Sequence, residues 1–363
     1  RGGGEKRYKH HALYTIPLAP DPDEKPLNAS EVRTKAAEAI RDGAINEALK
    51  LSMQAEILEP DHPNLPLATA VLLQEIGNYT QAEAKLRALL AVTPMHAPAL
   101  CALATIVYKE NHNLNESQRL LYRALAASPD DGGVHACMGD FVRETDGPLS
   151  EYKTCYSRAL KLAPNHTSAL VGMGMCLWKE GGFEQSEAMF RRALEQEPAM
   201  PVALTKYAEL LMEMRRFEEA EKLYEKAMYA QVNHVPTLLS YGRFLYEIRK
   251  DFAKADTHLN IALELRPTDT SVLMQGARYK QHVSEDLEGA ELLLSAVTTL
   301  EPSNFANWAN FGMLLWNGMQ NYSAAAGMFK EAIERASPEI ERAPILTTYA
   351  EMIETAPTDL LLE

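Results

Sequence analysis

Apolar residues recur at helical spacing along this chain, in stretches separated by glycine pairs and prolines. In the window Thr167–Pro198 the first apolar face follows the i, i+3, i+4, i+7 pattern and consists of Leu170, Met173, Gly174 and Leu177. Gly181 and Gly182 interrupt the pattern, and a second apolar face follows at Phe190, Ala193 and Leu194. Pro198 ends that face because proline lacks the N–H that the next helical hydrogen bond needs. The window predicts two helices joined by a tight turn.

The same two-helix unit recurs with a fixed period. The prolines that end its second helix are 34 or 35 residues apart, with one missed position at Val232. They are Pro60, Pro94, Pro129, Pro164, Pro198, Pro267 and Pro302. A period of this size predicts a repeat array, in which each unit buries its apolar face only against its neighbours.

A small residue marks the first helix of every unit. It falls on Ala36, Ala70, Ala104, Gly139, Gly174, Ala208, Gly242, Ala277 and Gly312. With this residue, the helix-turn-helix pattern and the terminal proline, the chain resembles the tetratricopeptide repeat family over nine repeats at residues 29–338. The resemblance implies an all-α, right-handed superhelical α-solenoid.

The two ends of the chain differ from the repeats. Residues 1–28 have no helical period and are predicted to form an extended arm, anchored by apolar side chains at Tyr8, Leu13, Tyr14 and Ile16. A solvated tail is the alternative for this segment. Residues 339–363 are predicted to form a capping helix and a short tail, with an apolar helical face at Ile345, Leu346, Tyr349, Met352 and Ile353.

Charge and composition narrow the range of partners. The net charge of −14 argues against general nucleic-acid binding, because an acidic surface repels a phosphate backbone. No apolar run approaches the roughly 18–20 residues that cross a bilayer, so we predict no membrane insertion. The four cysteines follow no close-pair spacing, which favours reduced thiols and an intracellular compartment, whether cytoplasmic, cytoskeletal or an organelle matrix.

The chain shows no catalytic constellation. The segment Gly172–Met175 imitates part of a dinucleotide-binding loop, but it lies within a predicted helix and no strand precedes it. His135 and Cys137 lack a second ligand pair at a zinc-like interval. We therefore predict a protein that is not an enzyme and that holds no cofactor or metal.

The resemblance implies that first helices line a groove and identifies the residues that point into it. Four positions after the small residue, the chain places Tyr108, Arg143, Trp178, Tyr246 and Trp316, and interleaved with them are Arg243 and Arg278, which directly follow the small residue. Aromatic rings and arginines suit a groove that grips a peptide segment. The alternative is that the rings pack within their own repeats.

Three functions fit these patterns. The favoured one is a non-catalytic scaffold or adaptor that positions other proteins, such as neighbouring subunits of a larger assembly. An RNA-binding helical-repeat protein of the pentatricopeptide kind is the second, because 35-residue intervals also suit that family. A regulatory array of a larger enzyme is the third.

Overall fold

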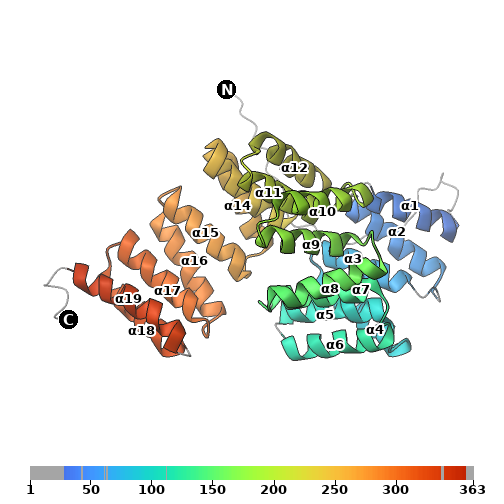
Figure 1. The fold of residues 1–363 in the computed structure, drawn as a ribbon, viewed down its shortest axis with the longest axis horizontal. Helices are drawn as coiled ribbons and strands as arrows, with labels where there is room; N and C mark the ends of the chain where they lie inside the picture. The colour runs from blue at the N-terminus through green and yellow to red at the C-terminus, as the bar shows by residue number, and fades with distance from the viewer. Residues whose placement is uncertain are drawn as a thin grey trace, which may run out of the picture. The chain divides into compact units, whose positions relative to one another are not determined.

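A computed structural model of the protein describes residues 28–41, 44–60, 62, 64–111, 113–336 and 339–356. All regular structure in these ranges is helical, as the sequence predicts, and the ranges contain no strand (Figure 1). The predicted arm with its anchors Tyr8, Leu13, Tyr14 and Ile16 lies outside the described residues, as does the tail after Ala356.

The helices divide into two compact units, with the boundary between Val92 and Thr93. The first unit contains α1 (Ala29–Arg41), α2 (Ile45–Leu58), α3 (Leu65–Glu75) and α4 (Tyr79–Val92). The second begins with α5 (Ala97–Asn111), α6 (Leu114–Ala127), α7 (Gly132–Glu144), α8 (Leu149–Leu162), α9 (Thr167–Lys179), α10 (Phe183–Gln196), α11 (Pro201–Glu213) and α12 (Phe217–Ala230). It continues with α13 (Val235–Phe244), η1 (Leu245–Arg249), α14 (Phe252–Leu265), α15 (Thr270–His282), α16 (Leu287–Leu300), α17 (Phe305–Met313), η2 (Leu314–Gly318), α18 (Tyr322–Arg335) and α19 (Glu339–Thr355).

Within each unit, the odd-numbered first helix of a repeat packs against the second helix that follows it. The small residue of the first helix lies at this contact. A Cβ atom added to Gly139 would lie 2.7 Å from the Tyr156 ring, and one added to Gly174 would lie 2.9 Å from the Phe190 ring. Both distances are shorter than real Cβ contacts, so a larger residue at Gly139 or Gly174 would force the ring of the second helix to move.

A serine in the second helix reinforces the same contact in two repeats. Ser117 Oγ donates to the carbonyl oxygen of Ala104 at 2.8 Å, and Ser186 Oγ donates to that of Gly174 at 2.8 Å. Both serines are fully buried, so the bonds satisfy hydroxyl groups that water does not reach. The two helices therefore approach closely and stay in register.

In most repeats, the repeat length goes with the backbone hydrogen bond that closes the turn between the first and second helices. In a 34-residue repeat, the backbone N–H at the start of the second helix bonds five residues back, as Gly182 does to Leu177. In four of the 35-residue repeats the corresponding bond reaches six residues back, as Asp251 does to Leu245. The extra residue produces the π-helical segments η1 and η2 in the seventh and ninth repeats.

The last helix, α19, packs against α18. Ile345 and Met352 are buried, and the Tyr349 ring lies 5.9 Å from that of Phe329. Leu346 and Ile353, the other members of its predicted apolar face, are exposed. In the part of the chain that the structure describes, no helix has the length and apolar character to cross a bilayer.

Candidate protein-binding face

The predicted stripe of aromatic residues bridges successive first helices. Tyr108, near the end of α5, donates its hydroxyl to the carbonyl oxygen of Glu144 in α7 at 2.6 Å. Its ring meets that of Phe141 edge-on, with ring centres 6.0 Å apart. Tyr108 therefore contacts the next repeat and does not pack only within its own.

Trp178 and Tyr246 do the same in later repeats. The Trp178 indole N–H donates to Glu213 Oε2 in α11 at 2.7 Å. Tyr246 meets Tyr279 of α15 edge-on at 5.4 Å. Trp316 is half-buried against the C-terminal core. These rings have a role between repeats that sequence analysis missed, and their part in partner binding stays a prediction.

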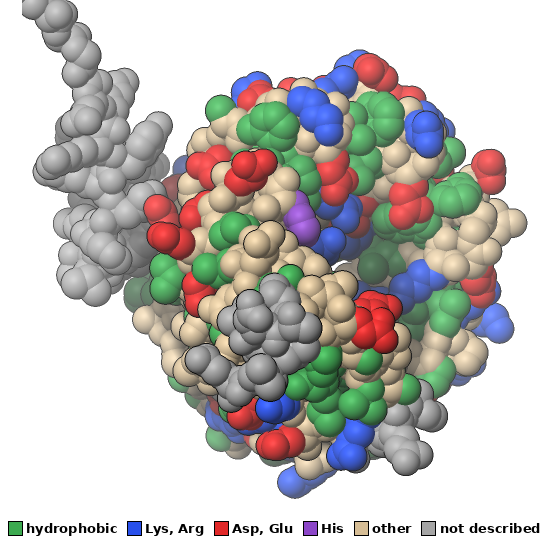
Figure 2. Space-filling view, turned by 90° about the vertical axis from the view of Figure 1, so that its left-hand side faces the viewer, with side chains coloured by type: hydrophobic (Ala, Val, Ile, Leu, Met, Phe, Trp, Pro, Cys, Tyr) green, Lys and Arg blue, Asp and Glu red, His purple; other side chains and the backbone are tan. Residues whose placement is uncertain are grey.

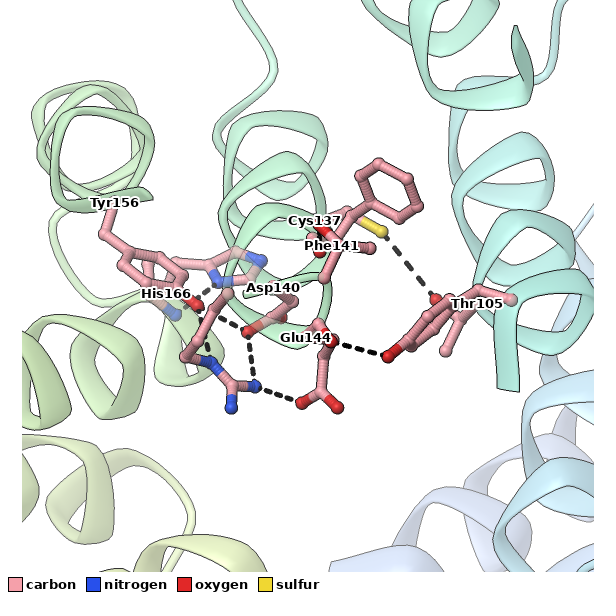
Figure 3. A network of polar contacts seen from close by, with 11 residues as sticks. Thr105, Cys137, Asp140, Phe141, Glu144, Tyr156 and His166 are labelled. Atoms are coloured by element: carbon pink, nitrogen blue, oxygen red, sulfur yellow. Dashed lines mark hydrogen bonds and ion pairs between the residues drawn. The ribbon is translucent and has the colours of Figure 1, made fainter. Parts of the chain in front are cut away.

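Arg143 is held by its own neighbours. Its guanidinium donates to Glu144 Oε1 at 2.6 Å, to Asp140 Oδ1 at 3.4 Å and to Tyr156 Oη at 3.3 Å. Tyr156 in turn donates to Asp140 Oδ1 at 2.7 Å. Figure 3 shows Asp140, Glu144 and Tyr156 converging in this network. Burial alone would lower the pKa of Arg143, but the adjacent Glu144 and Tyr156 oxygens and Asp140 raise it.

Arg243 and Arg278 are different, because both side chains are exposed and neither has an ion pair within the described ranges. They occupy the same repeat position in α13 and α15, directly after the small residue. Burial and the nearby Glu247 carboxylate raise the pKa of Tyr246 above its ordinary value. The positive charges of Arg243 and Arg278 oppose that rise, so both guanidinium groups act on the Tyr246 phenol.

We call Arg243, Tyr246 and Arg278 the arginine face. It combines two uncommitted positive charges with a half-buried ring, and Tyr246 lies on the π-helical segment η1. Irregular helical turns of this kind are frequent at functional sites. The 35-residue interval of this repeat is consistent with the extra residue of the turn, but the same interval recurs in repeats without a π-helical segment.

A polar cluster lies beside this face, between α11 and α13. Lys206 Nζ donates to Glu209 Oε2 at 2.8 Å, and Ser240 Oγ donates to Glu209 Oε1 at 2.5 Å. The Thr205 and Thr237 hydroxyls share a hydrogen bond of 2.6 Å. Lys206 is therefore neutralised within the protein, and it adds no free positive charge to the arginine face.

Charges of both signs are interspersed on the face that Figure 2 presents, with hydrophobic side chains between them. Among the described residues, no group of three or more histidine, cysteine, aspartate or glutamate side chains is arranged to hold a metal ion. The features that stand out are thus the ring contacts between repeats and the two unpaired arginines.

Comparison with known proteins agrees with this architecture. Tetratricopeptide repeat models match residues 67–132 and residues 177–240. These two stretches of the chain match tetratricopeptide repeats. The repeats of the chain continue through helix pairs that those two matches do not cover.

A TPR repeat-containing protein of Pseudomonas aeruginosa is 26% identical to this chain over 147 residues, which are 40% of the chain and 25% of that relative. The chain thus spans about a quarter of the relative's length.

Solved structures share the fold at low identity. The APC/C hetero-tetramer Cut9–Hcn1 matches with a TM-score of 0.64 and 13% identity, over 89% of this chain and 64% of the other. Yeast Tom70 matches with a TM-score of 0.51 and 14% identity, over 90% and 88%. A human IFIT1 dimer with m7Gppp-AAAA matches with a TM-score of 0.55 and 13% identity, over 87% and 92%. At such identities the likeness concerns the fold alone.

Proposed function

We propose that this protein is a non-catalytic scaffold that holds acidic segments of other proteins on its arginine face. The single observation that carries the proposal is the contrast among its arginines. Arg143 is committed to carboxylates of its own repeat, whereas Arg243 and Arg278 are exposed at equivalent positions of successive first helices and form no ion pair with any residue that the structure describes.

The chemistry of the face suits a carboxylate. Guanidinium groups bind carboxylates in a bidentate geometry, and such charge-assisted bonds are stronger than neutral ones. Tyr246 supplies an aromatic surface beside them, which can bury an apolar side chain of the same segment. An acidic partner must overcome repulsion from a chain of net charge −14, so local positive charge is needed where it binds.

The finer part of the proposal is that the repeats position neighbouring subunits within a larger assembly. The likeness of fold to a chain of the Cut9–Hcn1 hetero-tetramer supports this role, since that structure is itself an assembly. The likeness to IFIT1, whose structure contains a capped RNA, is the reason to include RNA in the test. The role of a regulatory array in a larger enzyme stays a prediction from the sequence.

Fluorescence polarisation with a labelled peptide of alternating glutamate and leucine tests the proposal. We expect the double variant Arg243→Glu/Arg278→Glu to weaken binding by about tenfold or more, which corresponds to about 1.4 kcal/mol. The matched control is Arg119→Glu/Lys226→Glu, which changes net charge equally at exposed positions on the second helices α6 and α12.

Equal loss of binding in both variants would show that only net charge matters, and would contradict the arginine face. A labelled RNA oligonucleotide serves as the competing probe. Tight RNA binding with steep salt dependence, together with no peptide binding, would overturn the scaffold and favour the RNA-binding alternative.

A further inference from the structure

Two cysteines from successive first helices meet where α5 packs on α7. Cys137 Sγ lies 3.7 Å from the carbonyl oxygen of Cys101 and 3.9 Å from Thr105 Oγ1. Thr105 Oγ1 also donates to the Cys101 carbonyl oxygen, at 3.1 Å. Figure 3 shows the Cys137 sulfur directed toward Thr105 on the neighbouring helix. Both cysteines are free thiols.

The two thiols also act on each other. The neighbouring Cys137 thiol and burial raise the pKa of Cys101 well above its ordinary value, so Cys101 stays a protonated thiol. Cys101 is only 8% exposed, whereas Cys137 is half-buried. Cys137 is therefore the more accessible of the two to an oxidant from solution, and the protonated Cys101 thiol lies deeper, so Cys101 reacts second.

We infer that Cys101 and Cys137 form a modification site at which a hydroperoxide links α5 to α7 through a disulfide. The inference is independent of the arginine face, because it concerns another pair of repeats. It also differs from the sequence-based expectation of four reduced thiols, since it adds a response to an oxidant.

The reaction balances in two steps. The Cys137 thiolate attacks one oxygen of the hydroperoxide, the O–O bond breaks, and the leaving oxygen takes up a proton, which leaves a sulfenic acid on Cys137. The Cys101 sulfur then attacks the sulfenic sulfur, and the S–O bond breaks to release water. Together the two thiols lose two electrons and two protons, and hydrogen peroxide is reduced to two molecules of water.

The other cysteines of the chain provide the internal control. Cys155 lies half-buried in α8, and Cys176 lies buried in α9. Neither has a thiol contact of the Cys101–Cys137 kind among the described residues. If reactivity depended on exposure alone, Cys155 would be oxidised together with Cys137, since both are half-buried. If proximity of the two cysteines decides, the disulfide forms only between Cys101 and Cys137.

Peptide mapping of the full chain tests the site directly. The folded protein is treated with hydrogen peroxide, alkylated with iodoacetamide and digested with trypsin without reduction. Lys109 and Arg123 separate Cys101 from Cys137, and Lys153 and Lys161 separate the remaining cysteines onto further peptides. We expect a linked pair containing Cys101 and Cys137, two hydrogens lighter than the free peptides, and a fall in thiol content from four to two.

Variants separate the two steps. In Cys101→Ser, dimedone should trap the sulfenic acid on Cys137, and no linked peptide should form. In Cys155→Ser, the link should form as in the original protein. Links that involve Cys155 or Cys176 in comparable amount, or oxidation of Cys137 to sulfinic acid without any link in the unsubstituted protein, would overturn the inference.

Discussion

Tyr156 and Tyr224 occupy the same position in two repeats, and both side chains are fully buried, yet their hydroxyl groups differ. Tyr156 Oη donates to Asp140 and accepts from Arg143. Tyr224 Oη has no hydrogen-bond partner among the described residues. The buried Tyr156 hydroxyl is therefore satisfied by hydrogen bonds, whereas the buried Tyr224 hydroxyl is not satisfied by any residue that the structure describes.

Two residues of the first helix account for this difference. Helix α7 carries Asp140 and Arg143 at the positions where α11 carries Glu209 and Met212. Glu209 is held by Lys206 and Ser240, so it makes no bond with Tyr224. The same tyrosine position is thus hydrogen-bonded or not according to which residues the first helix of its repeat carries.

The largest expected effect tests the packing around the Tyr156 ring. A Cβ atom on Gly172 would lie 2.3 Å from the Tyr156 ring, which is also packed against Gly139. We expect Gly172→Ala to lower the free energy of unfolding by about 3 kcal/mol, at the upper end of overpacking costs. Urea denaturation followed by circular dichroism measures it.

Gly327→Ala in α18 is the matched control, because nothing lies within 4 Å of the added atom. This change should be neutral or stabilise by up to about 1 kcal/mol, since alanine is the better helix former. Equal effects of the two substitutions would show that the Tyr156 ring does not fill the space beside Gly172.

The next largest effect concerns His234, which is the N-cap residue of α13 in the repeat that follows Tyr224. Burial, together with the positive charges of Lys109 and Lys206, lowers the pKa of His234 from 6.5 to about 4. Between these values the unfolded chain binds a proton that the folded chain does not, so stability rises as pH increases from about 4 to 6.5.

The contribution of His234 is on the order of 3 kcal/mol across this pH range. We expect His234→Gln to flatten the dependence of the unfolding midpoint on pH there. A profile that keeps its slope in the variant would assign the pH dependence to other groups.

The smallest expected effect tests the difference between the Tyr156 and Tyr224 hydroxyl groups directly. Tyr156→Phe removes a hydroxyl that serves Asp140 and Arg143, and it should cost about 1 kcal/mol or slightly more. Tyr224→Phe removes a hydroxyl without a partner, and it should be neutral or stabilising. Denaturation of both variants under one condition checks the sign of the difference, and equal losses would contradict it.

The sequence predicts the helix pairs of the repeat array because the features that mark them are local. Proline ends a helix wherever it stands, and a small residue at each first helix permits close packing. The π-helical turns lie in 35-residue repeats, but other repeats of that length contain none in the described residues. The interval therefore locates a π-helical turn only when the position of the extra residue within the repeat is known.

The candidate site was only partly predictable. Tyr108 and Trp178 lie near the ends of first helices and Tyr246 lies on η1, but the contact partners of these rings lie in the next repeat, and Glu213 in particular was not anticipated. Arg143 and Arg243 were grouped together as groove arginines, although the structure commits only the first to ion pairs. No local pattern distinguishes them.

The amino-acid sequence by itself determined that this protein is a helical repeat array with a marked period, because helix formation, helix ends and small-residue contacts depend on nearby residues. Only the tertiary structure decided which rings join neighbouring repeats, which thiols meet and which arginines stay unpaired. Hydrogen bonds and ion pairs require atoms to approach within about 3 to 4 Å, and that approach depends on how helices far apart in the chain pack together.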